Sequence, residues 1–310
     1  MITLQEAKVF FKQDKERLQD LAFNARLRHI GSKMLLYRRP FDPVSITKNQ
    51  CELSCKHCNK HYLEHMYQID SPDALEKLAK VLSRSGVKGL VLSGGSKRDG
   101  SVPIYEFRDS LKKIKSETGL KVNAHTGILN KEQAHQISEF LDAALTDVIG
   151  DRETIKEILG LNYGPEDYRK TLHYLQDFGV GNISPHIIVG LYYGKIRGEF
   201  NALDLLRKID PENIVIVVFI PTKGTEMGDI DPPKIEEVSK IISIARLMYP
   251  EKNISLSCVR PGGRYRLELD KEAIKSGINK IAVPSKAAYE TSKELGLDIT
   301  EITESRCCSW

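Results

Sequence analysis

Three cysteines in one short segment offer the strongest chemistry in this sequence. Cys51, Cys55 and Cys58 have the spacing C-x3-C-x2-C. Thiolates at this spacing can ligate three irons of a 4Fe-4S cluster and leave the fourth iron open to a substrate or cofactor. Zinc is an alternative, because Cys55, Cys58, His61 and His65 have a permissible tetrahedral spacing, but that set leaves Cys51 unexplained. Thiols without metal are a third interpretation, which the clustering disfavours.

The positions of the other three cysteines also point to metal chemistry. Cys258 ends an apolar run, whereas Cys307 and Cys308 belong to the C-terminal sequence RCCSW. The alternative is that Cys258 is a small buried residue and the terminal pair are solvent-exposed thiols.

Short β-branched runs alternate with stretches of helical period, as expected for repeated βα units around a parallel sheet. Eight strands, each followed by a helix, favour a (β/α)8 barrel of the TIM type, complete or nearly so, with the active site at the C-terminal ends of the strands. An open doubly wound sheet is the alternative, but it requires a glycine-rich phosphate turn after its first strand. The predicted strands lie at about 44–49, 87–93, 121–126, 143–149, 183–189, 213–220, 253–258 and 279–283.

The predicted domain organisation has three parts. Residues 1–40 form an N-terminal helical extension, residues 41–300 form the barrel, and residues 301–310 form a tail that folds over the barrel mouth. The first cysteine cluster directly follows the first predicted strand, which places its thiols in a loop at the functional end of the barrel. A tail can reach the same end without disturbing the barrel.

The composition is that of an ordinary soluble globular protein. The 310 residues carry 46 Lys+Arg and 42 Asp+Glu, and the resulting charge of +4 is spread along the chain, so binding to nucleic acid or to a membrane surface is not expected. No apolar run approaches the ~18 residues of a membrane span, and the N-terminus is charged from Glu6 onward, so we expect a cytoplasmic protein. Six clustered cysteines are not a disulfide framework.

The cysteine motif after the first strand resembles the signature of the radical S-adenosylmethionine (SAM) superfamily. This resemblance implies a (β/α) barrel whose 4Fe-4S cluster is held by Cys51, Cys55 and Cys58. It also implies that the open iron binds the amino and carboxyl groups of SAM. Reductive cleavage of SAM would then give a 5′-deoxyadenosyl radical, which abstracts hydrogen from an unactivated carbon.

Other segments match positions at which this superfamily binds SAM. The sequence LSGG at 92–95 resembles the family's Gly-Gly-Glu turn, with Ser96 in place of the acidic residue. The sequence HIIVG at 186–190 resembles its Gly-x-Ile-x-Gly segment beside the adenine, with a histidine for the first glycine. His57, just before the third cysteine of the motif, occupies the family's usual aromatic position. The residues implied to bind SAM are His57, Ser93, Gly94, Gly95, His186 and Gly190.

The sequence PTKGT at 221–225 and the eight-strand layout resemble the branch of biotin and lipoyl synthases, in which a second cluster supplies sulfur to the carbon radical. The resemblance implies that Cys258, Cys307 and Cys308 ligate a second 4Fe-4S cluster. Three thiolates leave one position of this cluster unfilled, and Ser309, water, Arg260 or a partner chain would supply the fourth ligand. The tail is similar to the Arg-Ser-Ser-aromatic end of lipoyl synthases, with cysteines replacing serines. The chain resembles one subunit of the two-protein archaeal lipoyl synthases.

The implied activity is insertion of sulfur into an octanoyl chain on a carrier protein. The implied partners are an octanoylated lipoyl-carrier protein, a second radical SAM subunit and an electron donor such as ferredoxin. One alternative is a radical SAM mutase or maturase of the same branch, which donates no sulfur. Another is a metal-bearing scaffold subunit without catalysis.

Overall fold

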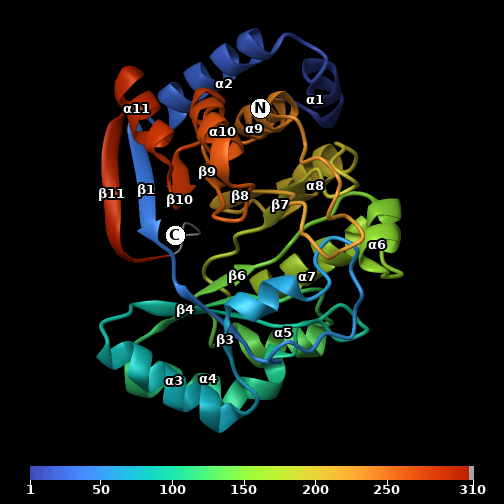
Figure 1. Cartoon of the computed structure of the whole chain (residues 1–310), viewed down its shortest axis with the longest axis vertical. Helices are drawn as coiled ribbons and strands as arrows, with labels where there is room; N and C mark the ends of the chain where they lie inside the picture. The colour runs from blue at the N-terminus through green and yellow to red at the C-terminus, as the bar shows by residue number, and fades with distance from the viewer. Residues whose placement is uncertain (307–310) are drawn as a thin grey trace.

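Parallel strands surrounded by helices form the body of the protein (Figure 1). The structure is a computed structural model, and it describes residues 1–306. The strands are β1 (Lys33–Arg39), β2 (Asp42–Ser45), β3 (Tyr67–Gln68), β4 (Gly89–Ser93), β5 (Lys121–His125), β6 (Ala143–Leu145), β7 (His186–Val189), β8 (Asn213–Val218), β9 (Asn253–Leu256), β10 (Lys280–Ala282) and β11 (Asp298–Ser305).

Helices follow most of these strands and lie outside the barrel (Figure 1). The α-helices are α1 (Leu4–Phe10), α2 (Lys15–His29), α3 (Pro72–Arg84), α4 (Arg108–Thr118), α5 (Lys131–Ser138), α6 (Arg152–Leu159), α7 (Pro165–Asp177), α8 (Glu199–Leu205), α9 (Ile235–Met248), α10 (Gly263–Lys275) and α11 (Lys286–Glu294). Three short 3-10 helices are η1 (His61–His65), η2 (Ile104–Phe107) and η3 (Leu206–Lys208).

The strands form two parallel sheets that together enclose a barrel. One sheet has the order β11-β1-β10-β9-β8-β7 and the other has the order β3-β2-β4-β5-β6. Isolated parallel bridges from Ala144 to Ile183 and from Asp147 to His186 join β6 to β7. On the opposite side the chain itself passes from β1 in one sheet to β2 in the other. Each of the eight predicted strands overlaps an observed strand, and the predicted barrel fold is confirmed.

Two segments differ from the predicted elements. Within the extension expected to be helical, Lys33–Arg39 form β1, which pairs with both β10 and β11. Within the expected tail, residues 301–305 belong to β11, which pairs with β1. Strand β1 is apolar on both faces and therefore lacks the alternation of a half-buried strand, whereas β11 is a polar edge strand.

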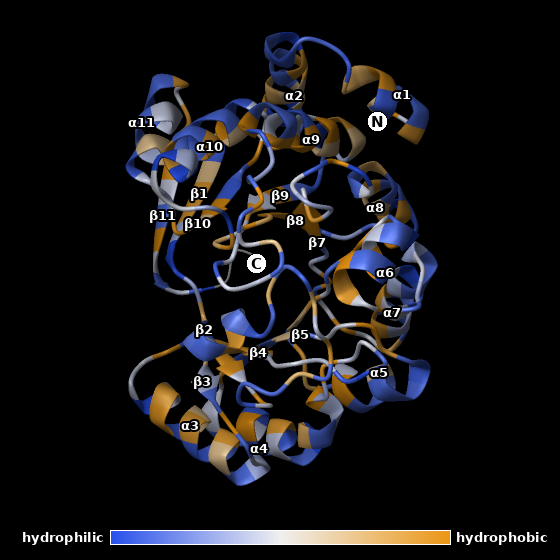
Figure 2. Ribbon diagram, turned by 45° about the vertical axis from the view of Figure 1, so that its right-hand side comes forward, coloured by the Kyte–Doolittle hydropathy of each residue, from blue (hydrophilic) through white to orange (hydrophobic). Residues whose placement is uncertain are grey.

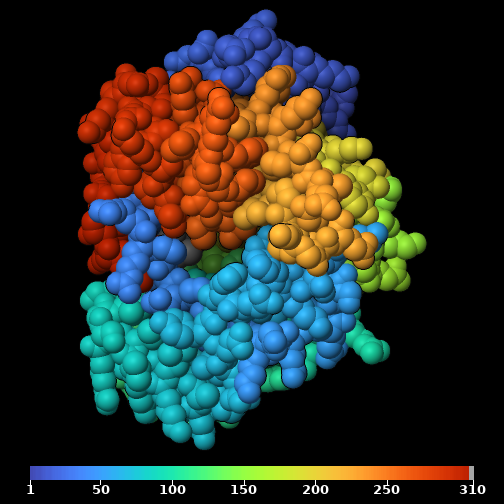
Figure 3. Space-filling model, viewed as in Figure 1, coloured from blue at the N-terminus to red at the C-terminus, as the bar shows by residue number. Residues whose placement is uncertain are grey.

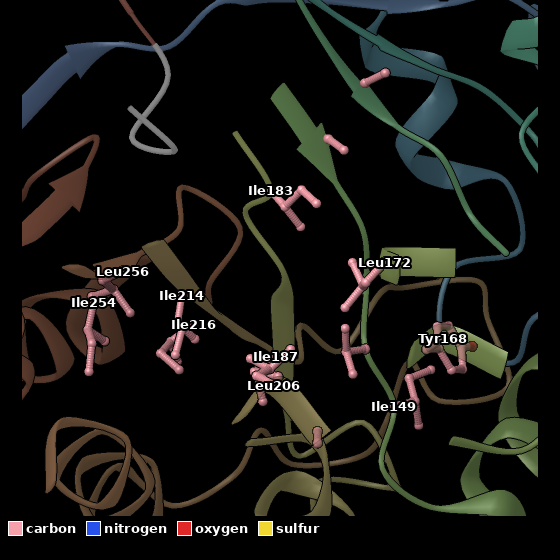
Figure 4. Packing of buried hydrophobic residues seen from close by; sticks show 14 of the residues in the cluster. Ile149, Tyr168, Leu172, Ile183, Ile187, Leu206, Ile214, Ile216, Ile254 and Leu256 are labelled. Carbon is pink, nitrogen blue, oxygen red and sulfur yellow. The ribbon is translucent and has the colours of Figure 1, made fainter. Parts of the chain in front are cut away.

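The main hydrophobic core lies between the barrel strands and the outer helices. Ile187 of β7, Ile214 and Ile216 of β8, and Ile254 and Leu256 of β9 belong to this core and lie side by side (Figure 4). Strand β8 is buried along its whole length and is hydrophobic at every position after Asn213, as buried parallel strands require (Figure 2). In the described part of the chain, no helix is long and apolar enough to cross a membrane.

The loops at the C-terminal ends of the strands form the mouth of the barrel. The cysteine loop follows β2, and the turn at residues 94–96 follows β4. Asp147 follows β6 and also lies at this end. Figure 3 shows a hollow in the surface where the two halves of the molecule meet. Parallel strands therefore deliver segments that are distant in the sequence to one site.

Candidate radical SAM site

The cysteine loop is held against the turn after β4. The backbone N–H of Ser96 donates to Sγ of Cys51 at 3.2 Å, and the backbone N–H of Glu52 donates to the carbonyl of Ser96 at 2.8 Å. Sγ of Cys55 lies 3.9 Å from the carbonyl of Leu159 at the end of α6. These contacts fix an irregular loop to two barrel elements, so all three motif cysteines face one cavity.

Cys55, His57 and Cys58 form the tightest group of potential metal ligands. Their ligand atoms lie within 4.8 Å of one another, and this is the only such trio in the part of the chain that the structure describes. Nδ1 of His57 is buried and has no hydrogen-bond partner there. An unpartnered nitrogen beside thiols indicates a place for a bound group.

The zinc set suggested by the spacing is not assembled. The rings of His61 and His65 lie on η1 and contact each other, with centroids 5.1 Å apart. Nδ1 of His61 lies 3.6 Å from Glu64, outside the group of thiols. The 3-10 turn after Cys58 therefore directs both imidazoles away from the cysteines, and the structure does not support this tetrahedral zinc site.

The local electrostatics favour a thiolate at Cys58. A hydrogen bond from the Cys55 thiol lowers the pKa of Cys58, and His57 acts in the same direction. The same pairing, together with burial, raises the pKa of Cys55. Because the thiolate is the form that binds iron, Cys58 is prepared for ligation before any metal arrives.

The cavity beside the thiols has a volume of about 220 Å³ and a largely apolar wall. Its lining includes Ser93, Gly94 and Gly95 from the turn after β4. A Cβ at position 95 would lie 1.9 Å from the carbonyl oxygen of Gln50 and 2.5 Å from Cα of Cys51. Only glycine therefore permits the close approach of the two loops, which fits the expected cradle for a cluster and SAM.

Two residues expected to bind SAM lie outside this cavity. Nδ1 of His186 is paired with the carbonyl of Ser184 at 2.9 Å, and neither His186 nor Gly190 lines the cavity of the cysteines. Gly190 has φ +78° and packs against Pro233, while its N–H donates to the buried carboxylate of Glu199 at 2.8 Å. The structure brings Ile188 of the same strand to the cavity instead.

Several cavity residues carry no signal in the sequence. Tyr62, Met66 and Tyr168 line the cavity, but none belongs to a recognisable motif. Asp147 also lines it, and burial raises the pKa of its carboxyl group. A polar residue after a barrel strand is common, so position alone does not distinguish Asp147 from an ordinary loop residue.

The pH dependence of the free energy of unfolding tests whether His186 is buried in its neutral form. Burial lowers its pKa to about 3, whereas an exposed histidine titrates near 6.5. The unfolded chain therefore binds the proton more tightly, so stability falls as the pH drops from about 6.5 towards 3. Between pH 7 and pH 5 we expect this group to remove about 2 kcal/mol of unfolding free energy. Denaturant unfolding at both pH values should show a smaller loss for His186→Gln than for wild type.

The matched control is His29→Gln, at the exposed end of α2. It should leave the difference between the two pH values unchanged. An equal pH dependence for His186→Gln and wild type would contradict a neutral, buried His186.

Cys258 lies two residues after β9, at the C-terminal end of this strand. It packs against Tyr37 of β1 and Ala282 of β10, and Ile302 of β11 packs against the same pair. The side chain is half-buried. The other predicted ligands of the second cluster, Cys307, Cys308 and Ser309, lie outside the described residues. The last described contact leading to them is the backbone N–H of Arg306, which donates to the carbonyl of Arg39 at 2.9 Å.

Arg260 was expected among the possible fourth ligands, and the structure contradicts this expectation. Its side chain is fully buried and forms a salt bridge with Asp270 at 2.9 Å. The remaining N–H groups donate to the carbonyls of Ser257, Ala282 and Val283. A guanidinium whose donors are all used in joining β9, α10 and β10 has a structural role.

Comparison with known proteins gives the class to which this site belongs. The family described as Radical SAM superfamily matches residues 45–195, and the family described as Biotin and Thiamin Synthesis associated domain matches residues 206–304. The chain therefore contains a radical SAM domain. This assignment confirms the predicted cofactors of the first site, a 4Fe-4S cluster and SAM.

Within this class, the chain is similar to biotin synthases. It is 24% identical to biotin synthase from Nitrosopumilus maritimus, over 90% of this chain and 86% of that protein. It is 26% identical to biotin synthase from Buchnera aphidicola subsp. Acyrthosiphon pisum, over 90% of this chain and 81% of that protein. The chain is therefore a radical SAM enzyme of the biotin synthase-like branch.

Solved structures agree on the fold. Methylornithine synthase superimposes with a TM-score of 0.70 at 17% identity, over 97% of this chain and 94% of that chain. The FeFe-hydrogenase maturase HydG from Carboxydothermus hydrogenoformans superimposes with a TM-score of 0.70 at 16% identity, over 96% of this chain and 76% of that chain.

Proposed function

We propose that this enzyme takes sulfur from a second iron-sulfur cluster and inserts it into an octanoyl chain on a carrier protein, as one subunit of a lipoyl synthase. The observation that carries the proposal is the position of Cys258. Cys258 and Ile302 of β11 pack against the same pair of residues, and β11 leads directly to Cys307 and Cys308. Cys258 and the last strand of the chain therefore contact the same pair of side chains, which supports a second cluster bound by Cys258 together with the cysteines that follow β11 in the sequence.

The chain's own residues prepare the first site for this chemistry. Cys51, Cys55 and Cys58 are the ligands of the radical SAM cluster, and the turn at Gly94 and Gly95 is the cradle beside it. When bound, the cluster and SAM supply a radical that removes hydrogen from an unactivated carbon. Apolar residues of the cavity wall exclude water, which protects such reactive groups. These wall residues include Leu53, Leu63, Met66, Ile128, Ile149 and Leu161.

The proposed partners follow from the substrate and from the electron requirement. An octanoyl chain on a carrier lysine has to enter the mouth while its protein stays outside, so the carrier protein docks on the loops around the mouth. A ferredoxin-like donor delivers the electron to the first cluster. Two C–S bonds are made in a lipoyl group, and we propose that a second radical SAM subunit shares this work.

A mutase or maturase without a sulfur donor is the second candidate. The fold similarity to methylornithine synthase and HydG favours it, since the whole barrel superimposes on both. This candidate makes Cys258, Cys307 and Cys308 dispensable. A scaffold subunit without catalysis instead predicts that SAM is not cleaved under reducing conditions.

The decisive experiment measures iron and sulfide content together with Mössbauer spectra on anaerobically reconstituted protein. The variant Cys51→Ala/Cys55→Ala/Cys58→Ala should retain the iron and sulfide of one 4Fe-4S cluster, the second one. Adding Cys307→Ala and Cys308→Ala should remove it, because the remaining thiol at Cys258 cannot hold a cluster alone. Adding His61→Ala and His65→Ala instead is the control and should have no effect.

Absence of iron from the first variant would overturn the proposal and favour the mutase. Substrate choice is tested separately by mass spectrometry of wild-type reactions with an octanoylated carrier protein. Sulfur incorporation into the octanoyl chain supports the lipoyl synthase activity. Incorporation only into a small biotin precursor would reassign the enzyme to the activity that its biotin synthase relatives carry in their names.

A further inference from the structure

Lys56 lies directly after Cys55, inside the cysteine motif, and its backbone is held on both sides. Its N–H donates to the carbonyl of Ile158 in α6 at 2.9 Å. Its carbonyl accepts from the N–H of Met227 in the loop after β8 at 3.3 Å. The segment between the two cysteines is therefore attached to elements that lie about 100 and 170 residues further along the chain.

The side chain of Lys56 reinforces these attachments. Nζ lies 2.7 Å from a carboxylate oxygen of Glu157, 3.1 Å from the hydroxyl of Tyr193 and 3.5 Å from a carboxylate oxygen of Glu226. The hydroxyl of Tyr193 also donates to Glu157 at 2.9 Å. One partner comes from α6, one from the segment after β7 and one from the loop after β8, so Lys56 joins three elements around the mouth.

We propose that Lys56 is a positioning residue for the radical SAM cluster. The cysteine loop has no regular secondary structure between Cys51 and Cys58, and ordering such a loop costs conformational entropy. Lys56 reduces this cost in the segment from Cys55 to Cys58, where two of the three thiols must be held at fixed positions. Its charge also offsets two carboxylates, which would otherwise disfavour the addition of an electron to a thiolate-bound cluster nearby.

The proposal depends on the radical SAM class alone and is independent of sulfur insertion. It is tested in reconstituted protein with Lys56→Met, which removes the charge and keeps an unbranched apolar side chain. We expect iron loss to a chelator to be about two- to fivefold faster than in wild type, the range that an exposed ion-pair network can contribute. Deuterium uptake of residues 51–58 should rise in the same variant, and this readout does not depend on activity.

Two further variants separate positioning from general destabilisation. Lys56→Arg keeps the charge and should restore wild-type iron retention and deuterium uptake. Lys80→Met removes a surface ion pair with Glu117 at 2.8 Å on α3, outside the cavity, and should leave both readouts at wild-type values. Wild-type iron retention and deuterium uptake in Lys56→Met would overturn the proposal, as would an equal response in Lys80→Met.

The charge contribution has its own measurement. The cluster of Lys56→Met should be harder to reduce, with a more negative midpoint potential. The double variant Lys56→Met/Glu157→Gln removes one of the two carboxylates that Lys56 faces and should recover part of that shift. Identical potentials in wild type and Lys56→Met would contradict the charge contribution.

Discussion

Replacing Cys51 with alanine is expected to abolish reductive cleavage of SAM, with the rate falling at least about 1000-fold. Cys51 is the predicted source of one of three thiolates for the cluster, and its Sγ, beside the cavity, accepts a hydrogen bond from the N–H of Ser96. Two thiolates cannot retain a cluster with a single open iron. Formation of 5′-deoxyadenosine by the anaerobically reconstituted protein, in the presence of a reductant, is the measurement.

Cys51 is the most informative of the three cysteines, because the tight group of ligands consists of Cys55, His57 and Cys58. If that group held a zinc ion, replacing Cys51 would not change the metal content. Retention of wild-type metal content and cleavage by Cys51→Ala would therefore contradict the cluster assignment. The matched control is Cys258→Ala, which removes a half-buried thiol outside the first site and should leave SAM cleavage intact.

Replacing Gly95 with alanine is expected to slow SAM cleavage by about 100-fold. The added Cβ would lie 1.9 Å from the carbonyl oxygen of Gln50 and 2.5 Å from Cα of Cys51, and both of these are backbone atoms. The cysteine loop must therefore move away from the turn after β4. A shift of about 1 Å in catalytic geometry is sufficient for a loss of this size. Iron content and the cleavage rate should be measured together.

Gly181 provides the control for this substitution. A Cβ at Gly181 would meet no atom within 4 Å, and its backbone does not adopt a positive φ, so Gly181→Ala should behave as wild type. Wild-type iron content and cleavage in Gly95→Ala would show that the two loops are not closely packed in solution. That result would also remove the physical reason for a glycine turn at this position.

The sequence alone predicted the barrel and its first site because both depend on local patterns. Most of the eight predicted barrel strands are short runs rich in apolar and β-branched residues, and each of the eight overlaps an observed strand. The three motif cysteines lie within eight residues, so their spacing limits the possible ligand geometry before folding. A loop after a parallel strand must lie at the C-terminal end of the barrel, which predicted the location of the site.

Local patterns were insufficient where a residue's role depends on distant partners. His61 and His65 fit a zinc spacing, but a 3-10 turn directs them away from the thiols. Arg260 lies two residues after the predicted ligand Cys258, yet α10 brings Asp270 against it, and the two side chains form a buried salt bridge. Strand β11 is polar, and only its pairing with β1 makes it a strand.

The sequence by itself therefore determined the class of fold and predicted both the functional end of the barrel and three thiols for the first cluster. Only the tertiary structure decided which neighbours support those thiols. Lys56 contacts Glu157 and Tyr193, which lie 101 and 137 residues further along the chain. Gly95, in the turn after β4, packs against Cys51, in the loop after β2. The physical reason is that ion pairs and close backbone contacts between distant segments leave no periodic trace in the sequence, whereas strands and ligand spacings do.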